Sequence, residues 1–190
     1  MVVVGSRGLG GFTGLLLGSV GVALAAHAHC PVAVVRAATP DGPLPTTGPV
    51  VVGIDGSDNS LAATEVAFGE AAGRKAPLAA VHTWSDLPLE PPFGPVPSWP
   101  ETTEVEIYQR QVLADRLAAW TTKHPDIAVR RVVTRDKPAA SLLAQAKNAQ
   151  LIVLGSHGRG GFTGMLLGST SQALLHHAPC PVIVARPEHG

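Results

Sequence analysis

The sequence predicts an α/β fold built on a parallel sheet. Two observations predict it: short apolar runs alternate with segments of helical periodicity from residue 49 to residue 190, and turn-forming residues separate them. The length of 190 residues accommodates one domain with an extension. Charged residues make up only 15% of the chain, so it has enough apolar residues to bury a core.

The predicted strands are short apolar runs. The first, Pro49–Asp55, has the continuous apolar character of a parallel strand buried on both faces. Strands joined through helices run parallel, and such sheets bind ligands beyond the carboxyl ends of their strands. Asp55 and Gly155 each lie at such an end, so we expect them at the same edge of the sheet. The other predicted strands are Leu78–Trp84, Ile127–Thr134, Leu151–Leu154 and Pro181–Ala185.

The predicted helices have apolar residues at helical spacing. Ser57 or Asp58 can cap the first of them, and Pro138 suits the first turn of the third. Residues 85–100 contain six prolines and are predicted to form an irregular loop, either a lid over a ligand or an ordinary connection. The predicted helices are Ser57–Arg74, Glu101–His124, Pro138–Asn148 and Ser169–His177.

A long internal repeat organises the chain. Residues 5–36 recur at 155–186, an offset of 150 without a gap, and 21 of the 32 positions are identical. The second copy follows the rest of a domain, whereas the first follows almost nothing. We therefore expect a C-terminal fragment of a first domain at 1–36, a linker rich in Pro, Thr and Gly at 37–48, and a complete domain at 49–190. Either the true protein begins upstream, which we favour, or the fragment caps the edge of the complete domain.

Several classes of function are excluded by composition. Residues 12–28 alone resemble a secretory signal, but the same pattern recurs 150 residues later, so we interpret them as folded protein. No apolar stretch reaches the roughly 18–20 residues of a membrane span. Lys+Arg and Asp+Glu both number 14 and no basic run occurs, which argues against binding to nucleic acid. Two cysteines make no disulfide framework, so we expect a cytoplasmic protein.

The glycines after the fourth predicted strand form a candidate phosphate site. The pattern is G-x2-G-x9-G-S, with glycines at 155, 158 and 168. Glycine lets main-chain N–H groups approach an anion, and Gly168 opens a helix whose first N–H groups favour phosphate. The hydroxyls of Ser169, Thr170 and Ser171 add donors. The chain contains no Gly-Lys-Ser/Thr of a Walker A loop, and a dinucleotide fingerprint would follow the first strand instead.

This pattern, with LIVLGSHG at its start, CPVIVAR after its helix and PVVVGIDGS at residues 49–57, resembles the universal stress protein family. The resemblance covers Pro49–Arg186, and the fragment 1–36, an N-terminal β-α-β fragment of a second copy, resembles the family's C-terminal third. It implies a five-stranded parallel sheet with helices on both faces (adenine nucleotide alpha hydrolase-like). It also implies dimers formed through the fifth strand and, in one subclass, binding of ATP, with or without Mg²⁺, at little or no turnover.

The resemblance also implies roles for individual residues. Asp55, preceded by Gly53 and Ile54, would lie near the ribose, and the backbone of Thr83 would frame the adenine. The ribose and phosphate path would be lined by Gly155, His157 and Gly158. The phosphates would be held by Gly168, Ser169, Thr170 and Ser171.

The fragment is expected to act at the sheet edge. Homodimers are one prediction; the other is an internal antiparallel pair of Pro31–Val35 with Pro181–Val184, which would leave Val2–Val4 as an exposed apolar edge. His176, His177 and Cys180 have loosely metal-like spacing, but no second cluster completes a set, so no metal site is predicted. Cys30 and Cys180 are expected to be small buried side chains, with a disulfide between them left open.

Three functions follow as hypotheses. The first is an ATP-binding regulator of a stress or dormancy response. The second is an enzyme on the same fold, a slow ATPase or a nucleotidyl transferase, although related adenylating folds place their phosphate loop after the first strand. The third is a nucleotide-free scaffold.

Overall fold

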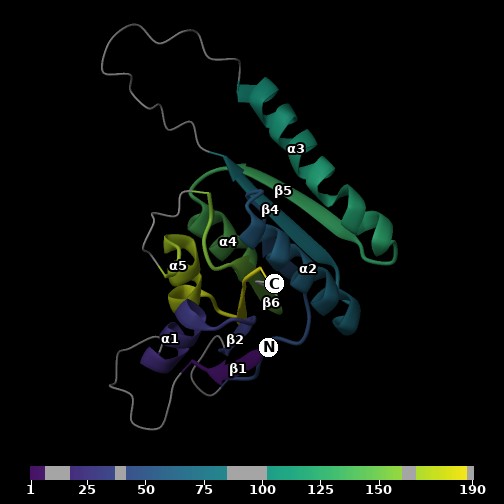
Figure 1. The fold of residues 1–190 in the computed structure, drawn as a ribbon. Helices are drawn as coiled ribbons and strands as arrows, with labels where there is room; N and C mark the ends of the chain where they lie inside the picture. The colour runs from purple at the N-terminus through teal and green to yellow at the C-terminus, as the bar shows by residue number, and fades with distance from the viewer. Residues whose placement is uncertain (7–17, 37–41, 85–101, 160–165, 188–190) are drawn as a thin grey trace, which may run out of the picture.

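The computed structural model describes residues 1–6, 18–36, 42–84, 102–159 and 166–187. They form a seven-stranded sheet flanked by helices (Figure 1). The strands are β1 (Val2–Gly5), β2 (Val32–Val35), β3 (Val50–Gly53), β4 (Leu78–Trp84), β5 (Val129–Arg135), β6 (Leu151–Gly155) and β7 (Val182–Ala185). The helices are α1 (Ser19–His27), α2 (Asp58–Arg74), α3 (Thr102–Lys123), α4 (Pro138–Ala146) and α5 (Ser169–His177).

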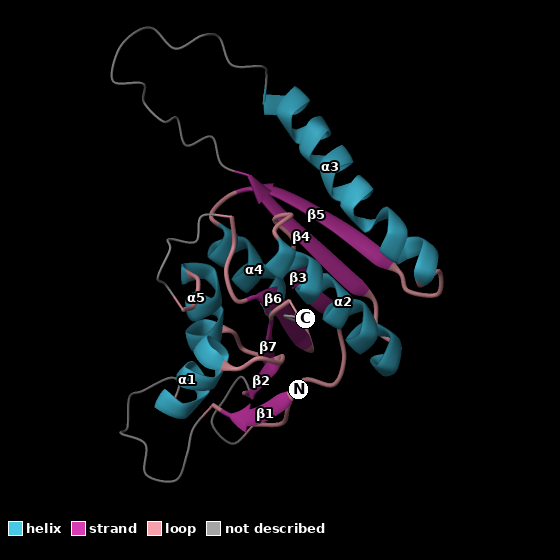
Figure 2. Ribbon diagram, viewed as in Figure 1, coloured by secondary structure: helices cyan, strands magenta, loops and turns pink. Residues whose placement is uncertain are grey.

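The strand order corrects the predicted five-stranded sheet. The order is β1-β2-β7-β6-β3-β4-β5, and neighbouring strands are parallel except β2 and β7. The predicted strands of the second copy are consecutive in it, but the sheet continues into β2 and β1 (Figure 2). A single seven-stranded sheet results, because the edge of β7 is paired rather than free.

The predicted internal pairing of the two copies is observed. Val32 lies opposite Val184, and Val34 lies opposite Val182, in antiparallel register. The ladder is shorter than predicted at its start because Pro31 and Pro181 precede the two strands and have no N–H to donate. Since β2 covers the edge of β7, that edge is not open to the last strand of a second molecule.

Successive residues of each strand point to opposite faces of the sheet and pack into two hydrophobic cores, one on each face. Val51 and Ile152 face a core that contains Leu142 of α4 and Leu174 of α5. On the other face, neighbouring strand residues such as Val52 pack with residues of α2 and α3. The alternation follows from the two-residue period of a strand. Helices therefore cover both faces, with α1, α4 and α5 on one and α2 and α3 on the other (Figure 1).

Most predicted boundaries agree to within one or two residues. Ser57 is the N-cap of α2, because its side chain accepts a hydrogen bond from the amide of Ser60. The same helix ends at Arg74, and its C-cap Lys75 has the left-handed φ of 52° common at helix C-termini. The predicted loop at 85–100 lies outside the described residues. Among the helices that the structure describes, none is both long and apolar enough to cross a bilayer.

The outer edge of β1 is exposed, unlike the equivalent edge of the second copy. Val153 of β6 is completely buried between β3 and α2, whereas its repeat equivalent Val3 is 63% exposed. Val2 is also exposed, and β1 pairs with β2 alone in the described sheet. A free apolar edge offers unpaired N–H and C=O groups to other chains.

We expect Val3→Lys to reduce concentration-dependent association. The charge would oppose edge-to-edge pairing while leaving the half-buried Val4 of β1 in place. Val20→Lys is the matched control, because Val20 is 67% exposed on a helix rather than on a strand. Light scattering over a concentration series measures the effect, and equal association of both variants and the wild type would contradict it.

Candidate functional site

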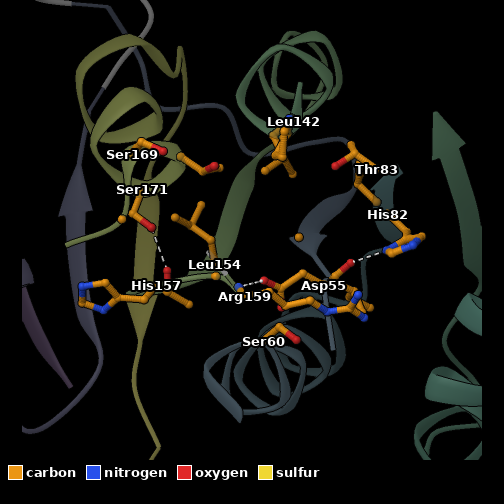
Figure 3. A pocket seen from close by; sticks show the side chains of 18 residues that line it. Asp55, Ser60, His82, Thr83, Leu142, Leu154, His157, Arg159, Ser169 and Ser171 are labelled. Carbon is orange, nitrogen blue, oxygen red and sulfur yellow. Dashed lines mark hydrogen bonds between the residues drawn. The ribbon is translucent and has the colours of Figure 1, made fainter. Parts of the chain in front are cut away.

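A cavity of about 440 Å³ lies beyond the carboxyl ends of β3 and β6. These strands are neighbours, while the chain continues from β3 to β4 on the other side, so the cavity sits at the point where strand order reverses. Its size falls within the range of small-molecule sites, roughly 300–1,000 Å³. Figure 3 shows around it side chains from the turn after β3, from α2, β4, α4, β6 and α5, and from the loop after β6.

Every residue predicted for the nucleotide site lines this cavity. The set comprises Gly53, Ile54, Asp55, Thr83, Gly155, His157, Gly158, Gly168, Ser169, Thr170 and Ser171. They come from four separate stretches of the chain, and the sheet brings them together. The ring of His157 points away from Asp55 in Figure 3, and its Nδ1 lies 3.2 Å from Ser156 Oγ.

Asp55 is held by donors on both of its oxygens. Oδ1 accepts from the amide of Ser57 at 2.9 Å and from its hydroxyl at 2.7 Å, while Oδ2 accepts from the amide of Arg159 at 2.9 Å. Burial by itself would raise the pKa of Asp55, but the hydrogen bonds from Ser57, Arg159 and Ser60 outweigh it and lower the pKa below its ordinary value. A fixed, ionised carboxylate therefore faces the cavity.

This lowered pKa predicts a pH-dependent contribution to stability. The ordinary pKa of an aspartate carboxyl group is about 4. Well above that pH, Asp55 is ionised in the folded and the unfolded state, and its hydrogen bonds stabilise the folded state. As the pH falls, Asp55 is protonated in the unfolded chain before it is protonated in the folded protein, so this stabilisation decreases and is lost once the pH is below the lowered pKa. The difference in free energy of unfolding between wild type and Asp55→Asn should therefore shrink from about pH 6 to about pH 3. Urea unfolding measures it, and a difference independent of pH would contradict it.

The N–H groups of the turn after β3 donate to acceptors within the turn and the start of α2. Gly56 N–H donates to Ser60 Oγ at 3.0 Å, and Leu61 N–H donates to Ser57 O at 3.0 Å. Gly56 has a φ of +85°, and a Cβ there would lie 2.5 Å from the guanidinium carbon of Arg116. Burial lowers the pKa of Arg116, with a further contribution from Arg159. This turn is a filled structural element and offers few free N–H groups to a phosphate.

On the side of the cavity formed by the loop after β6, three glycines allow close contacts that a side chain would prevent. A Cβ at Gly155 would lie 2.7 Å from Asn59 Cβ in the first turn of α2. A Cβ at Gly158 would lie 2.7 Å from Asp55 Oδ2. A Cβ at Gly168 would lie 3.3 Å from His157 Cα and 3.8 Å from the amide nitrogen of Gly158. Glycine at these positions thus permits the contact between Asp55 and the loop and leaves the approach to the Gly158 amide open.

The N-terminus of α5 opens on the same cavity without a side-chain cap. The first N–H groups of a helix have no partner within it, so those of Ser169 and Thr170 are available to a ligand. Two predicted donors are already engaged, however: Gly168 N–H donates to Ser156 O at 2.7 Å, and the Ser171 hydroxyl donates to Gly155 O at 2.7 Å. Ser171 is buried, and its hydroxyl closes the loop onto the helix.

The comparisons with known proteins agree with this architecture. The family model described as Universal stress protein family matches residues 1–36 and 46–186. The chain belongs to the universal stress protein family. Universal stress protein Rv1996 of Mycobacterium tuberculosis is 49% identical over 193 residues, and universal stress protein Rv2623 of the same species is 46% identical over 186. Each alignment covers 98% of this chain, which spans only 58% and 61% of those two relatives.

Solved universal stress proteins share the fold. One from Archaeoglobus fulgidus matches with a TM-score of 0.64 at 25% identity, covering 97% of this chain and 61% of that one. Another, solved in complex with cAMP, matches with a TM-score of 0.52 at 24% identity and covers 74% of this chain and 97% of that one. The match to the Archaeoglobus fulgidus protein covers nearly the whole of this chain.

The universal stress protein cavity also contains residues that the sequence analysis did not assign to the nucleotide site. They are Ser60, Val81, His82, Pro138, Leu142, Leu154 and Arg159. Pro138 had a detectable signal, because it opens a helix directly after a strand and so lies at the same edge of the sheet as Asp55. Leu142 follows one helical turn later, and its Cδ1 would lie 3.3 Å from a Cβ at Gly53.

His82, on β4, connects the lining of the cavity to α3. It is buried, with Nδ1 2.7 Å from Ile54 O and Nε2 2.9 Å from Gln109 Oε1 of α3. Both contacts are to oxygen atoms. With Nδ1–H donating to Ile54 O, a neutral ring accepts at Nε2 when the Gln109 amide is turned so that its NH2 group, rather than Oε1, faces the ring. Both ring nitrogens are therefore used to connect β3, β4 and α3.

The cysteines of this universal stress protein are both free. Cys180 is buried, and burial raises the pKa of its thiol to about 12. Cys30, its repeat equivalent, is half-buried. A neutral, buried Cys180 matches the expected role as a small core side chain.

Proposed function

We propose that this chain binds ATP in the cavity beyond β3 and β6 and acts as a nucleotide-responsive regulator in stress or dormancy. The observation that carries the proposal is that the uncapped N-terminus of α5 and the ionised carboxylate of Asp55 open on one cavity. A helix N-terminus favours phosphate, and a fixed carboxylate accepts hydrogen bonds from sugar hydroxyls. A nucleoside phosphate carries both groups. In this proposal residues 49–190 form the binding domain, 37–48 the linker and 1–36 the fragment of a second domain.

We assign the ends of the ligand as follows. Asp55 accepts from the ribose, the backbone near Thr83 frames the adenine, and the N–H groups of Gly158, Ser169 and Thr170 bind the phosphates. Ser171 supports the phosphate end through its bond to Gly155 instead of donating its hydroxyl to the ligand. Mg²⁺ would enter on the phosphates, because both oxygens of Asp55 already accept hydrogen bonds.

The nucleotide class has support from a protein of the same fold. One universal stress protein was solved in complex with cAMP, and cAMP has an adenine, a ribose and a phosphate in common with ATP. Its identity to this chain is 24%, so the likeness concerns the fold, and the choice of ligand rests on the residues of this cavity.

A regulator fits the site better than the enzyme hypothesis. The turn after β3, where an adenylating enzyme of a related fold would hold its phosphate loop, has its N–H groups engaged with Ser57, Ser60 and Asp55. Three groups in the cavity lining are able to transfer protons, namely Asp55, His82 and His157, and each already has hydrogen-bond partners in the protein. We therefore propose slow hydrolysis or none.

The test is equilibrium dialysis of ATP, with mass spectrometry of any nucleotide released when freshly purified protein is denatured. Asp55→Ala and Gly168→Glu should each weaken ATP binding at least about tenfold, the first by removing an acceptor and the second by placing a negative charge beside the phosphates. Asp58→Ala is the matched control, because Asp58 is exposed and outside the cavity. Equal affinity in all four proteins would defeat the site, and steady release of ADP or pyrophosphate would favour the enzyme.

A further inference from the structure

The two copies of the repeat exchange arginine caps. Arg186, directly after β7, donates from Nη2 to Ala25 O at 3.0 Å and to Ala26 O, at the C-terminus of α1. Arg36, its repeat equivalent directly after β2, donates from Nη1 to Leu175 O at 3.4 Å and to His176 O, at the C-terminus of α5. Each guanidinium thus binds the last carbonyl groups of a helix in the other copy, where a positive charge is favoured.

Arg186 has a further contact with the segment that leads into α5, whose N-terminus lines the cavity. Its Nη2 donates to Leu166 O at 3.1 Å, two residues before Gly168, the N-cap of α5. Leu167, between them, is buried in the core that also contains Ala25 of α1. The segment that leads into the open N-terminus of α5 is therefore linked to α1 through Arg186, and the two share one core.

The end of β7 also holds the second loop of the cavity. Ser156 N–H donates to Ala185 O at 3.0 Å, and Gly168 N–H donates to Ser156 O at 2.7 Å. The two phosphate-side segments, 155–159 and 166–168, are thus bonded to each other and to the residue before Arg186. A displacement of α1 that pulls on Arg186 would move both.

We propose that Arg186 is a positioning residue that couples the seating of α1 to the phosphate end of the nucleotide site. Nucleotide binding then stabilises the packing of α1, and packed α1 strengthens nucleotide binding, because such a coupling is reciprocal. The inference rests on the proposed function. Lysine is a poor substitute, because the carbonyl groups of Ala25, Ala26 and Leu166 all accept from Nη2, and the lysine side chain is one atom too short to bring its ammonium to that position.

The experiment combines ATP titration with hydrogen exchange of the α1 amides. In the wild type, ATP should slow exchange in residues 19–27. Arg186→Ala should weaken ATP binding about five- to tenfold and abolish this protection, within the range of typical couplings between sites. Arg186→Lys should act in the same direction while keeping the charge, which covers the case in which the alanine variant does not fold. Arg36→Ala removes the corresponding cap from the C-terminus of α5, so it should leave the ATP affinity within about twofold of the wild type.

The outcomes separate this inference from the proposed function. A wild type that binds no ATP contradicts the function itself. A wild type that binds ATP without slowing exchange in α1, or an Arg186→Lys variant that binds ATP as tightly as the wild type, overturns only the role of Arg186. Equal losses of affinity in Arg36→Ala and Arg186→Ala would also overturn it, because they would indicate general loosening of the two copies.

Discussion

Gly158→Ala is expected to weaken ATP binding at least about tenfold while lowering the free energy of unfolding by only about 1 kcal/mol. The added methyl would stand 2.7 Å from Asp55 Oδ2, closer than a carbon and an oxygen can approach. Asp55 would have to turn, and it would lose the hydrogen bond from the Arg159 amide. The carboxylate would then no longer face the ribose as proposed. Isothermal titration with ATP and urea unfolding measure the two effects.

Gly69→Ala provides the matched control. A Cβ at Gly69, in the middle of α2, would have no heavy atom within 4 Å, so the substitution should leave ATP binding unchanged. It should stabilise the protein by about 0.5–1 kcal/mol, because alanine loses less backbone entropy in a helix than glycine. Unaltered ATP affinity in Gly158→Ala would show that the position of the Asp55 carboxylate does not matter for binding.

Phe68→Ala should cause a large loss of stability, about 3–5 kcal/mol. Phe68 of α2 is completely buried and stacks on Trp120 of α3, with ring centroids 5.7 Å apart. Its ring also lies against that of His124, with the two ring centroids 5.3 Å apart. Removing the ring leaves a cavity under both helices that the sheet cannot close. Thermal unfolding should show a drop in Tm on the order of 10 °C.

Phe68→Leu separates volume from aromatic stacking. Leucine keeps most of the apolar volume, so it should cost less than about 1.5 kcal/mol. A loss in Phe68→Leu as large as that in Phe68→Ala would mean that stacking on Trp120, rather than filled volume, stabilises this core. A negligible loss in Phe68→Ala would contradict the close packing between α2 and α3.

Local patterns in the sequence predicted much of the fold. The strand Leu78–Trp84 and the helix Ser169–His177 have the predicted bounds, because apolar periodicity and turn residues act over a few positions. The 150-residue offset also predicted that β1, α1 and β2 repeat β6, α5 and β7, and the structure contains all six elements at that offset. The extent of the sheet could not be predicted locally, because it depends on whether the edge of β7 is covered.

The candidate site was predictable where a residue adjoins a strand end. Asp55 and Gly155 could be placed together because parallel strands deliver their carboxyl ends to one edge. The hydrogen bonds that the Gly168 N–H and the Ser171 hydroxyl make within the protein could not be predicted, because they depend on how the loop folds back onto β6 and β7. A glycine or a hydroxyl looks equally available in a sequence whether or not the structure has used its donor.

The sequence by itself determined the α/β class, the repeat, and the residue types at the cavity, since periodicity, spacing and glycine content are properties of short segments. Only the tertiary structure decided that β2 joins β7 in one sheet, that Arg116 lies against Gly56, and that Arg186 connects α1 to Leu166. These contacts join residues 20 to 161 positions apart. Their geometry is set by strand register and helix packing, which no short stretch of sequence specifies.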